Sequence, residues 1–234
     1  MQVLASATVL LVVYALWGKP GFLKLHMTIL GPALGAAEGT SLFAIIPYFY
    51  WALTSLLLRV AAPLAIIVWW ARRRPGDFGF RLHGLTSHAW LYFLLFGLMV
   101  PVVLAASFTP AFQAKYPLYF DRAGGWTYFA AYQLAYGIQF VGVEAFFRGF
   151  LTFGLYPRLG YVSLFVMVIP YSMVHFGKPP LEVFMAIPAG LLLGYLALKS
   201  RTWILGALLH WMVAITMDLL ALLHRGGFGQ IPSG

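Results

Sequence analysis

Long apolar runs separated by short polar segments dominate the sequence. Runs of about 16 to 28 residues approach or exceed the ~30 Å hydrocarbon core of a bilayer, since each helical residue rises about 1.5 Å. The pattern predicts an all-α, polytopic membrane protein with about seven transmembrane helices. The runs cover roughly residues 2–17, 43–70, 87–107, 127–154, 161–177, 182–198 and 203–223.

The segment 21–42 fits this pattern least well. Gly31, Gly35 and Gly39 recur there at every fourth position, a spacing typical of helices that pack closely on their neighbours. We expect an interfacial or re-entrant piece. The alternative is an eighth crossing of the membrane.

The run 43–70 is too long for one upright helix. It is interrupted by Pro47, Arg59 and Pro63, so we expect a tilt or a kink in this span.

The composition excludes an ordinary soluble domain, because 62% of the residues are hydrophobic and only 9% are charged. The absence of cysteine excludes disulfides, thiolate nucleophiles and zinc–thiolate sites. No repeat or linker divides the chain, so we treat residues 1–234 as a single membrane domain. We expect an integral, multi-pass protein of a bacterial plasma membrane.

The formal charge of +9 does not indicate nucleic acid here, because the basic residues lie mainly between the apolar runs. A dense arginine cluster follows Trp69 and Trp70, which are typical interfacial anchors. We therefore place this loop and the amino terminus in the cytoplasm. With seven spans, the carboxyl terminus lies on the opposite face. The cluster consists of Arg72, Arg73, Arg74 and Arg81.

Few ionisable side chains lie inside the predicted spans, and each costs about 2.5–3.5 kcal/mol on insertion scales. Each therefore needs a partner, a water-filled cavity or a task. Most lie in the C-terminal half, which we expect to carry the chemistry. They are Arg59, Glu144, Arg148, His175, His210 and Asp218.

Spacing and depth bring these groups together. Glu144 and Arg148 are four residues apart on one helix, a spacing that suits an ion pair. Such a pair can be purely structural or can be part of a functional site. Glu144 and His175 lie at about 21 and 25 Å from the turn between their helices, so the two can meet.

His210 and Asp218 share a face of the last predicted helix at i and i+8. By the same measure they lie about 13 and 25 Å from the turn that precedes this helix. Three helices therefore direct titratable groups towards one stratum of the membrane, which is the usual mark of a site.

Three short motifs occur in order along the C-terminal half: Glu144-x3-Arg148-Gly149, Tyr171-x3-His175, and His210 on the last predicted helix. This sequence resembles the CAAX protease and bacteriocin-processing (CPBP) family of polytopic membrane proteins, which includes the CAAX prenyl endopeptidases. The resemblance covers about residues 127–223 and implies a CPBP-like core.

The sequence departs from the family pattern at three positions. Val143 stands where the family has the first of two adjacent glutamates, the residue assigned to activating water in the resembling proteases. Ala214 replaces the asparagine of the third motif, and Tyr171 replaces a phenylalanine.

The remaining groups can still hydrolyse an amide. Glu144 would be the base, His175 would orient the water or polarise the carbonyl, and His210 would be a second electrophilic contact. In a supporting role, Arg148 would hold Glu144, and Asp218 would hold an imidazole or replace the lost asparagine.

A less favoured variant places a divalent metal between Glu144, His175 and His210. No His-Glu-x2-His signature supports that variant, so we expect no metal. We expect no organic cofactor either.

Two functions stay open, nearly evenly weighted. The slightly favoured one is a glutamate-dependent endopeptidase that cleaves a membrane-associated peptide or protein. The other is a non-catalytic scaffold, assembly factor or subunit of a membrane-protein complex. In a protein that inherited the fold without its activity, replacements such as Val143 and Ala214 are expected. A transporter ranks third, since the sequence has no inverted repeat. Membrane lipids are partners in every case, and nucleic acid in none.

Overall fold

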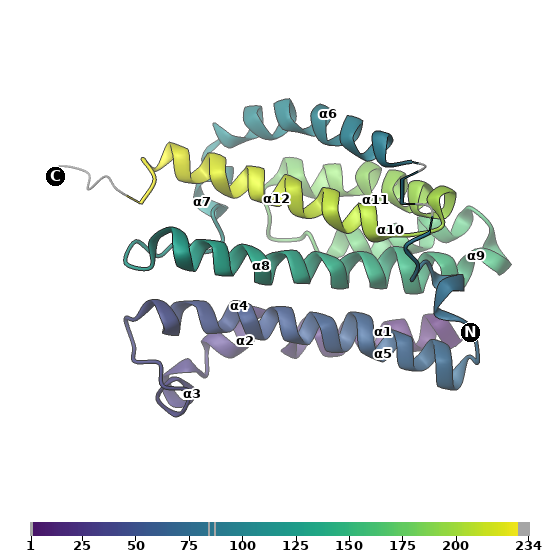
Figure 1. Ribbon diagram of the computed structural model, residues 1–234, viewed down its shortest axis with the longest axis horizontal. Coiled ribbons are helices and arrows are strands. Elements are labelled where there is room, and N and C mark those ends of the chain that lie inside the picture. Colours follow the sequence, from purple (N-terminus) through teal and green to yellow (C-terminus); the bar gives the residue numbers. More distant parts are fainter. Residues whose placement is uncertain (1, 84, 87, 229–234) are drawn as a thin grey trace.

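The computed structural model describes residues 2–83, 85–86 and 88–228, and every regular element in these ranges is helical. Six helical segments are long and apolar enough to cross a membrane, and they run side by side along the molecule (Figure 1). The predicted all-α, polytopic architecture is confirmed. The segments are α1 (Gln2–Trp17) with α2 (Pro20–Lys24), α4 (Ser41–Ser55) with α5 (Ala62–Ala65), α6 (Ala89–Ser107), α8 (Gly125–Glu144) with α9 (Gly154–Leu159), α11 (Pro180–Ser200) and α12 (Ile204–His224).

The fifth predicted span, 161–177, is the exception. Its helix, α10 (Val162–Met173), has 12 residues, or about 18 Å, and falls short of the bilayer core. The chain then passes through turns at 174–179 before Pro180 begins α11. Among the described residues, six helices rather than seven therefore reach spanning length, and α10 completes the bundle as a shorter member. Residue 87, the predicted start of the third span, lies outside the described residues.

The segment 21–42 makes no eighth crossing. It contains the short helices α2 and α3 (Met27–Ala33), which lie with their connecting turns at one end of the bundle (Figure 1). The Cβ of an alanine at Gly31 would lie 2.9 Å from a backbone oxygen, so this glycine does allow close packing. Gly35 and Gly39 instead occupy turns with φ of 71° and 82°, which side chains disfavour.

The long second span contains Pro47 within the regular helix α4, and it stays helical past Pro63 by widening its turns. Two π-helical segments, η1 (Leu56–Ala61) and η2 (Ile66–Trp70), flank α5. The ring of Pro63 would clash with the carbonyl group four residues earlier in a regular α-helix, and the wide turns before it relieve that clash. The interruption expected between residues 43 and 70 is therefore a local change of helix type.

The helix formed by α8, η4 (Ala145–Phe153) and α9 is the centre of the protein. In its most apolar stretch 78% of the residues are buried, compared with 11–33% for the other spanning helices. It lies between one layer containing α1 and α4 and another containing α6, α10, α11 and α12 (Figure 1). Side chains on this helix therefore contact both layers.

Arg59 is buried at the contact between the N-terminal helices and α8. Its side chain is 3% exposed, and Nη1 donates a hydrogen bond of 3.1 Å to Gln139 Oε1. Its guanidinium carbon lies 3.5 Å from the centre of the Tyr14 ring, and Ser55 also donates to Gln139 Oε1. Neutral polar groups and an aromatic face thus solvate this cation, which forms no ion pair in the part of the chain that the structure describes.

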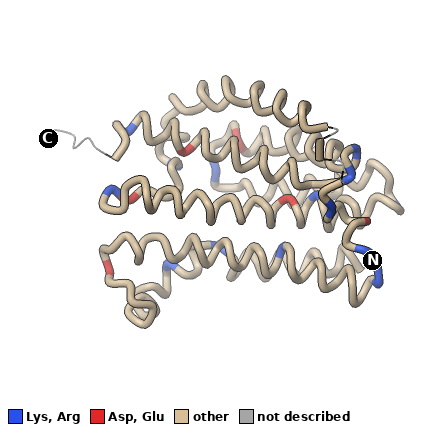
Figure 2. The backbone as a smooth tube through the Cα atoms, viewed as in Figure 1, with Lys and Arg blue, Asp and Glu red and all other residues tan. Residues whose placement is uncertain are grey.

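Basic residues gather at the end of the bundle where α1 begins and where the loop after η2 lies (Figure 2). Trp69 and Trp70 precede this loop and are 78% and 54% exposed, as interfacial anchors would be. The beginning of α1 and the end of α12 lie at opposite ends of the molecule (Figure 1).

The arrangement predicts the sidedness of the protein. Reporter fusions before residue 2 and within the arginine loop should both give a cytoplasmic signal, because basic loops are retained on that side. A reporter fused after residue 228 should give the opposite signal. Finding both termini on one side would contradict the odd number of passages made by six spanning helices and α10.

Candidate functional site

Glu144 ends α8 in the interior of the bundle. Its side chain is 1% exposed, and its Oε1 accepts a hydrogen bond of 2.8 Å from Nη1 of Arg148, which is fully buried. Arg148 lies one turn further on in η4, as the spacing predicts. Removing one member of such a buried pair costs about 3–5 kcal/mol, because the other charge is then uncompensated.

His210 approaches the same carboxylate from α12. Its Nδ1 lies 2.9 Å from Glu144 Oε1, and its ring stacks on Phe140 at 4.8 Å between centroids. Since an ionised carboxylate can only accept hydrogen bonds, Nδ1 carries the proton and Nε2 keeps its lone pair. Glu144 thus fixes both the orientation and the tautomer of His210.

Tyr171 and His175 complete the group from α10 and the turn that follows it. The Tyr171 hydroxyl lies 3.3 Å from His210 Nε2, and the Arg148 guanidinium carbon lies 4.0 Å from the centre of the Tyr171 ring. His175 Nδ1 donates a hydrogen bond of 2.9 Å to the Tyr171 carbonyl. Nε2 of His175 is therefore also the unprotonated nitrogen of its ring. Side chains from α8, η4, α10 and α12 and from the turn after α10 thus lie together in one group.

A cavity of about 450 Å³ opens beside these side chains, between α6, α8, α11 and α12. Tyr171, His175 and His210 line it, whereas neither Glu144 nor Arg148 does. Most of the remaining lining is aliphatic or aromatic. The imidazoles thus face a space large enough for a ligand, while the ion pair lies behind them.

A second polar group lines the same cavity at the beginning of α11. Glu182 Oε1 accepts a hydrogen bond of 2.5 Å from Lys178, and its Oε2 accepts one of 2.5 Å from the Tyr116 hydroxyl. The sequence pattern does not single out this group, because Lys178 and Glu182 lie at the boundary of two predicted spans and Tyr116 lies in a loop. The i, i+4 spacing of the lysine and the glutamate was the available signal.

Asp218 lies elsewhere. Its Oδ2 accepts hydrogen bonds from the Tyr132 hydroxyl at 3.0 Å and from the Gln133 amide at 2.8 Å. Both partners are on α8, two turns of α12 away from His210. Asp218 is therefore positioned to hold α12 against α8, and no contact joins it to His175 or His210 in the part of the chain that the structure describes.

Two of the three departures from the motif pattern, at positions 143 and 214, replace a polar residue by an apolar one, and their surroundings differ. Val143 is 6% exposed and packs in an apolar cluster with Phe147 and Tyr171. Ala214 is 5% exposed and lines the cavity one turn after His210. An apolar side chain therefore fills the position of the family's first glutamate.

Metal ligation is a separate question. Within the described ranges, no group of three or more His, Asp or Glu side chains is arranged to hold a metal ion. His210 Nδ1 and His175 Nδ1 are engaged with Glu144 and with a carbonyl group, so the Nε2 atoms are the ring nitrogens that these two bonds leave to a metal.

Comparison with known proteins agrees with this geometry. Residues 125–216 match the family described as Type II CAAX prenyl endopeptidase Rce1-like. This segment contains all three motifs and confirms the resemblance that they predict. No curated protein and no solved structure matches the chain significantly.

Gly206 makes room for the buried carboxylate. A Cβ at this position of α12 would lie 2.7 Å from Glu144 Oε2, and Arg148 and His210 hold the carboxylate on its other side. We expect Gly206→Ala to destabilise the protein by about 1–3 kcal/mol through overpacking. The measurement is thermal unfolding of the purified protein in detergent.

Gly97→Ala is the matched control, since nothing lies within 4 Å of a Cβ at this position of α6. It should leave the unfolding temperature unchanged or raise it slightly, because alanine is the better helix former. If both variants were equally stable, Glu144 would not be held as tightly as we describe.

Proposed function

We propose, from the membership of residues 125–216 in the Type II CAAX prenyl endopeptidase Rce1-like family, that this integral membrane protein hydrolyses peptide bonds of a membrane-associated substrate. The observation that carries the proposal is the chain of contacts from Glu144 through His210 to Tyr171, which ends at an apolar cavity. A substrate with an apolar segment or a lipid tail would suit that cavity.

In this proposal Glu144 acts through His210. The carboxylate is 1% exposed and lies behind the imidazole, so it is poorly placed to meet water itself. It accepts a hydrogen bond from Nδ1 of His210, holds the ring in one orientation and stabilises the imidazolium that forms when Nε2 takes a second proton. This role differs from the direct base that the sequence suggests, and it requires no glutamate at position 143.

Hydrolysis then proceeds in two steps. His210 Nε2 removes a proton from water as the water oxygen attacks the peptide carbonyl carbon, which gives a tetrahedral oxyanion and an imidazolium. The Tyr171 hydroxyl donates a hydrogen bond to the oxyanion. The imidazolium returns the proton to the departing nitrogen as the carbon–nitrogen bond breaks, which yields a carboxylic acid and an amine. His175 Nε2 accepts a hydrogen bond from a substrate N–H and positions the substrate.

A non-catalytic membrane subunit is the second candidate. It is favoured by Val143, whose packing against Phe147 and Tyr171 leaves no carboxylate at the position assigned to water activation in the family. On this view Glu144 and Arg148 stabilise the bundle, and the cavity binds an apolar segment of a partner without cleaving it.

Removal of one hydroxyl tests the catalytic proposal. Tyr171→Phe keeps the ring beneath Arg148 but removes the oxyanion donor, so we expect cleavage to fall by about 10²–10³ with little change in stability. Cleavage by the His210→Ala variant should fall by a factor of at least about 10², because the base is lost. Peptide products in native membranes and cleavage of lipid-modified C-terminal peptides by the purified protein are the measurements.

Tyr92→Phe is the control, since Tyr92 is a buried tyrosine, 5% exposed, that does not line the cavity. It should cleave as the wild type does. If wild type, Tyr171→Phe and His210→Ala had identical peptide products, and if the wild type co-purified with a stable complex, the scaffold would replace the enzyme.

Position 143 gives an independent test. Val143→Glu restores the family's pair of glutamates but buries a second carboxylate beside Glu144. An enzyme with a working site should keep or gain activity. A scaffold should only lose stability, by several kcal/mol, because the new charge has no partner. Activity assays and thermal unfolding of the same preparation separate the two outcomes.

A further inference from the structure

A second cavity, of about 340 Å³, lies at the end of the bundle that carries the arginine loop. None of its lining residues lines the first cavity, so it is a separate site. It is formed by the loop after η2, the end of η4, α9 and the adjoining turn, and the end of α11. Four basic side chains line it: Arg73, Arg81, Lys199 and Arg201.

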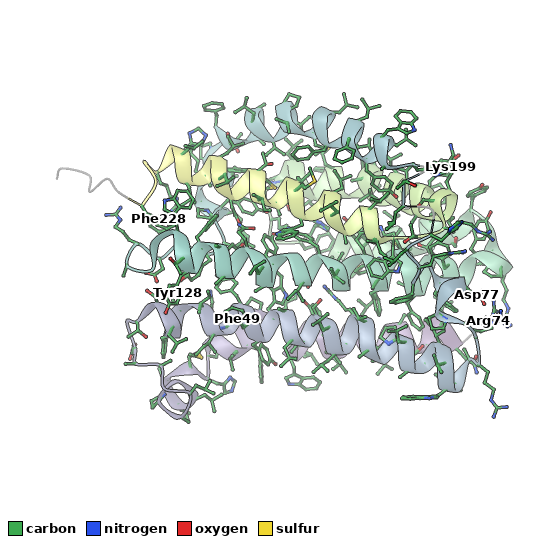
Figure 3. All side chains as sticks on the ribbon, viewed as in Figure 1. Phe49, Arg74, Asp77, Tyr128, Lys199 and Phe228 are labelled. Carbon is green, nitrogen blue, oxygen red and sulfur yellow. The ribbon has the colours of Figure 1, made fainter. Side chains whose placement is uncertain are left out.

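Positive charge predominates in this cavity. Its only acidic residue among those described is Asp77, whose Oδ2 lies 3.7 Å from Arg73 Nε, and both side chains are about half exposed. Lys199 and Arg201 form no ion pair with any described residue. In Figure 3, Asp77, Arg74 and Lys199 lie at the same end of the molecule, whereas Tyr128 and Phe228 lie at the other. The cavity therefore has uncompensated cations to offer an anion.

Hydrogen bonds between two loops fix part of this group. Arg81 Nε donates a hydrogen bond of 2.8 Å to the Arg201 carbonyl, and Thr202 Oγ1 donates one of 2.9 Å to the Arg81 carbonyl. These bonds join the loop after η2 to the turn between α11 and α12. Basic groups distant in sequence are thereby held around one space before any ligand binds, which reduces the entropic cost of binding.

The remaining walls are suited to the membrane interface. The centre of the Tyr161 ring lies 5.5 Å from that of Tyr156 and 6.1 Å from that of Tyr195. Tyrosines are typical of the headgroup level, where the ring is apolar and the hydroxyl donates hydrogen bonds. All three line the cavity.

An exposed apolar surface continues from this level down α10. Val162, Phe165 and Ile169 follow one another at helical spacing and are 58%, 59% and 64% exposed. A ligand held at Tyr161 could thus lay a hydrocarbon chain along this face. A free phosphate would make no use of it.

We propose that this cavity binds the phosphate of an anionic membrane lipid, with the headgroup among the four cations and an acyl chain along α10. Arginine forms paired hydrogen bonds with phosphate oxygens, and lysine adds a point charge. The site is independent of the peptidase proposal, since it shares no residue with that cavity.

The test uses the full chain, purified in neutral detergent and titrated with short-chain phosphatidylglycerol, phosphatidylcholine or inorganic phosphate. Native mass spectrometry counts retained lipid, and thermal unfolding reports stabilisation. We expect phosphatidylglycerol to bind and to raise the unfolding temperature, and the other two to have little effect. In the double variant Arg73→Gln/Lys199→Gln, binding should weaken by about tenfold or more, because each basic group contributes to attraction of the anion.

The control is Lys115→Gln/Arg122→Gln, which removes the same charge from exposed residues that line neither cavity. It should bind phosphatidylglycerol as the wild type does. Equal weakening in both double variants would reduce the effect to overall charge and overturn the site. Binding of inorganic phosphate as strong as that of the lipid would assign the cavity to a soluble anion. Equal binding of phosphatidylcholine, whose phosphate is balanced by the choline cation, would show that the net negative charge of the headgroup is not recognised and would overturn the proposal.

Discussion

A carboxylate buried among apolar helices must be compensated from its surroundings, and the C-terminal half of this protein is arranged around that requirement. Glu144 receives Arg148 from its own helix and His210 from α12, while Gly206 leaves space for its second oxygen. Since the interior has a low dielectric constant, none of these contacts can be lost without exposing a charge to an apolar medium. Glu144 therefore links α8, η4 and α12, and the orientation of the His210 imidazole at the cavity is a consequence.

The N-terminal half meets the same requirement with neutral partners. Arg59 is surrounded by Gln139, Ser55 and the face of the Tyr14 ring rather than by an acid. Gln139 and Glu144 are on the same helix, so α8 provides the acceptor for a buried arginine in each half. It can do so because it lies between the two layers, where it is the most buried of the long helices. Arg148 is paired with a carboxylate, whereas Arg59 is paired with an amide. The amide of a glutamine compensates a cation without adding a second charge that must also be buried.

The helical class and most of the site were predictable from the sequence, because long apolar runs and costly ionisable residues are local signals. Glu144 and His175 could be placed at a similar depth by counting residues from a turn, and Arg148 could be assigned to Glu144 by its spacing of four residues. Asp218 shows the limit of this counting, since depth does not specify which neighbour a side chain faces. The length of α10 was not predictable either, because apolar character continues beyond Met173 while the backbone turns. Neutral groups such as Gln139 carry no insertion penalty large enough to attract attention.

The π-helical segment η4 has a consequence for comparing sequences. Its hydrogen bonds reach one residue further than those of an α-helix, so more residues are used for each rotation. In structural terms such a segment is an inserted residue accommodated within a continuous helix. A relative in which this stretch is regular α-helix would need a gap somewhere within Ala145–Phe153 for the flanking residues to superpose. An alignment without that gap would match side chains on different faces of the helix on one side of the segment.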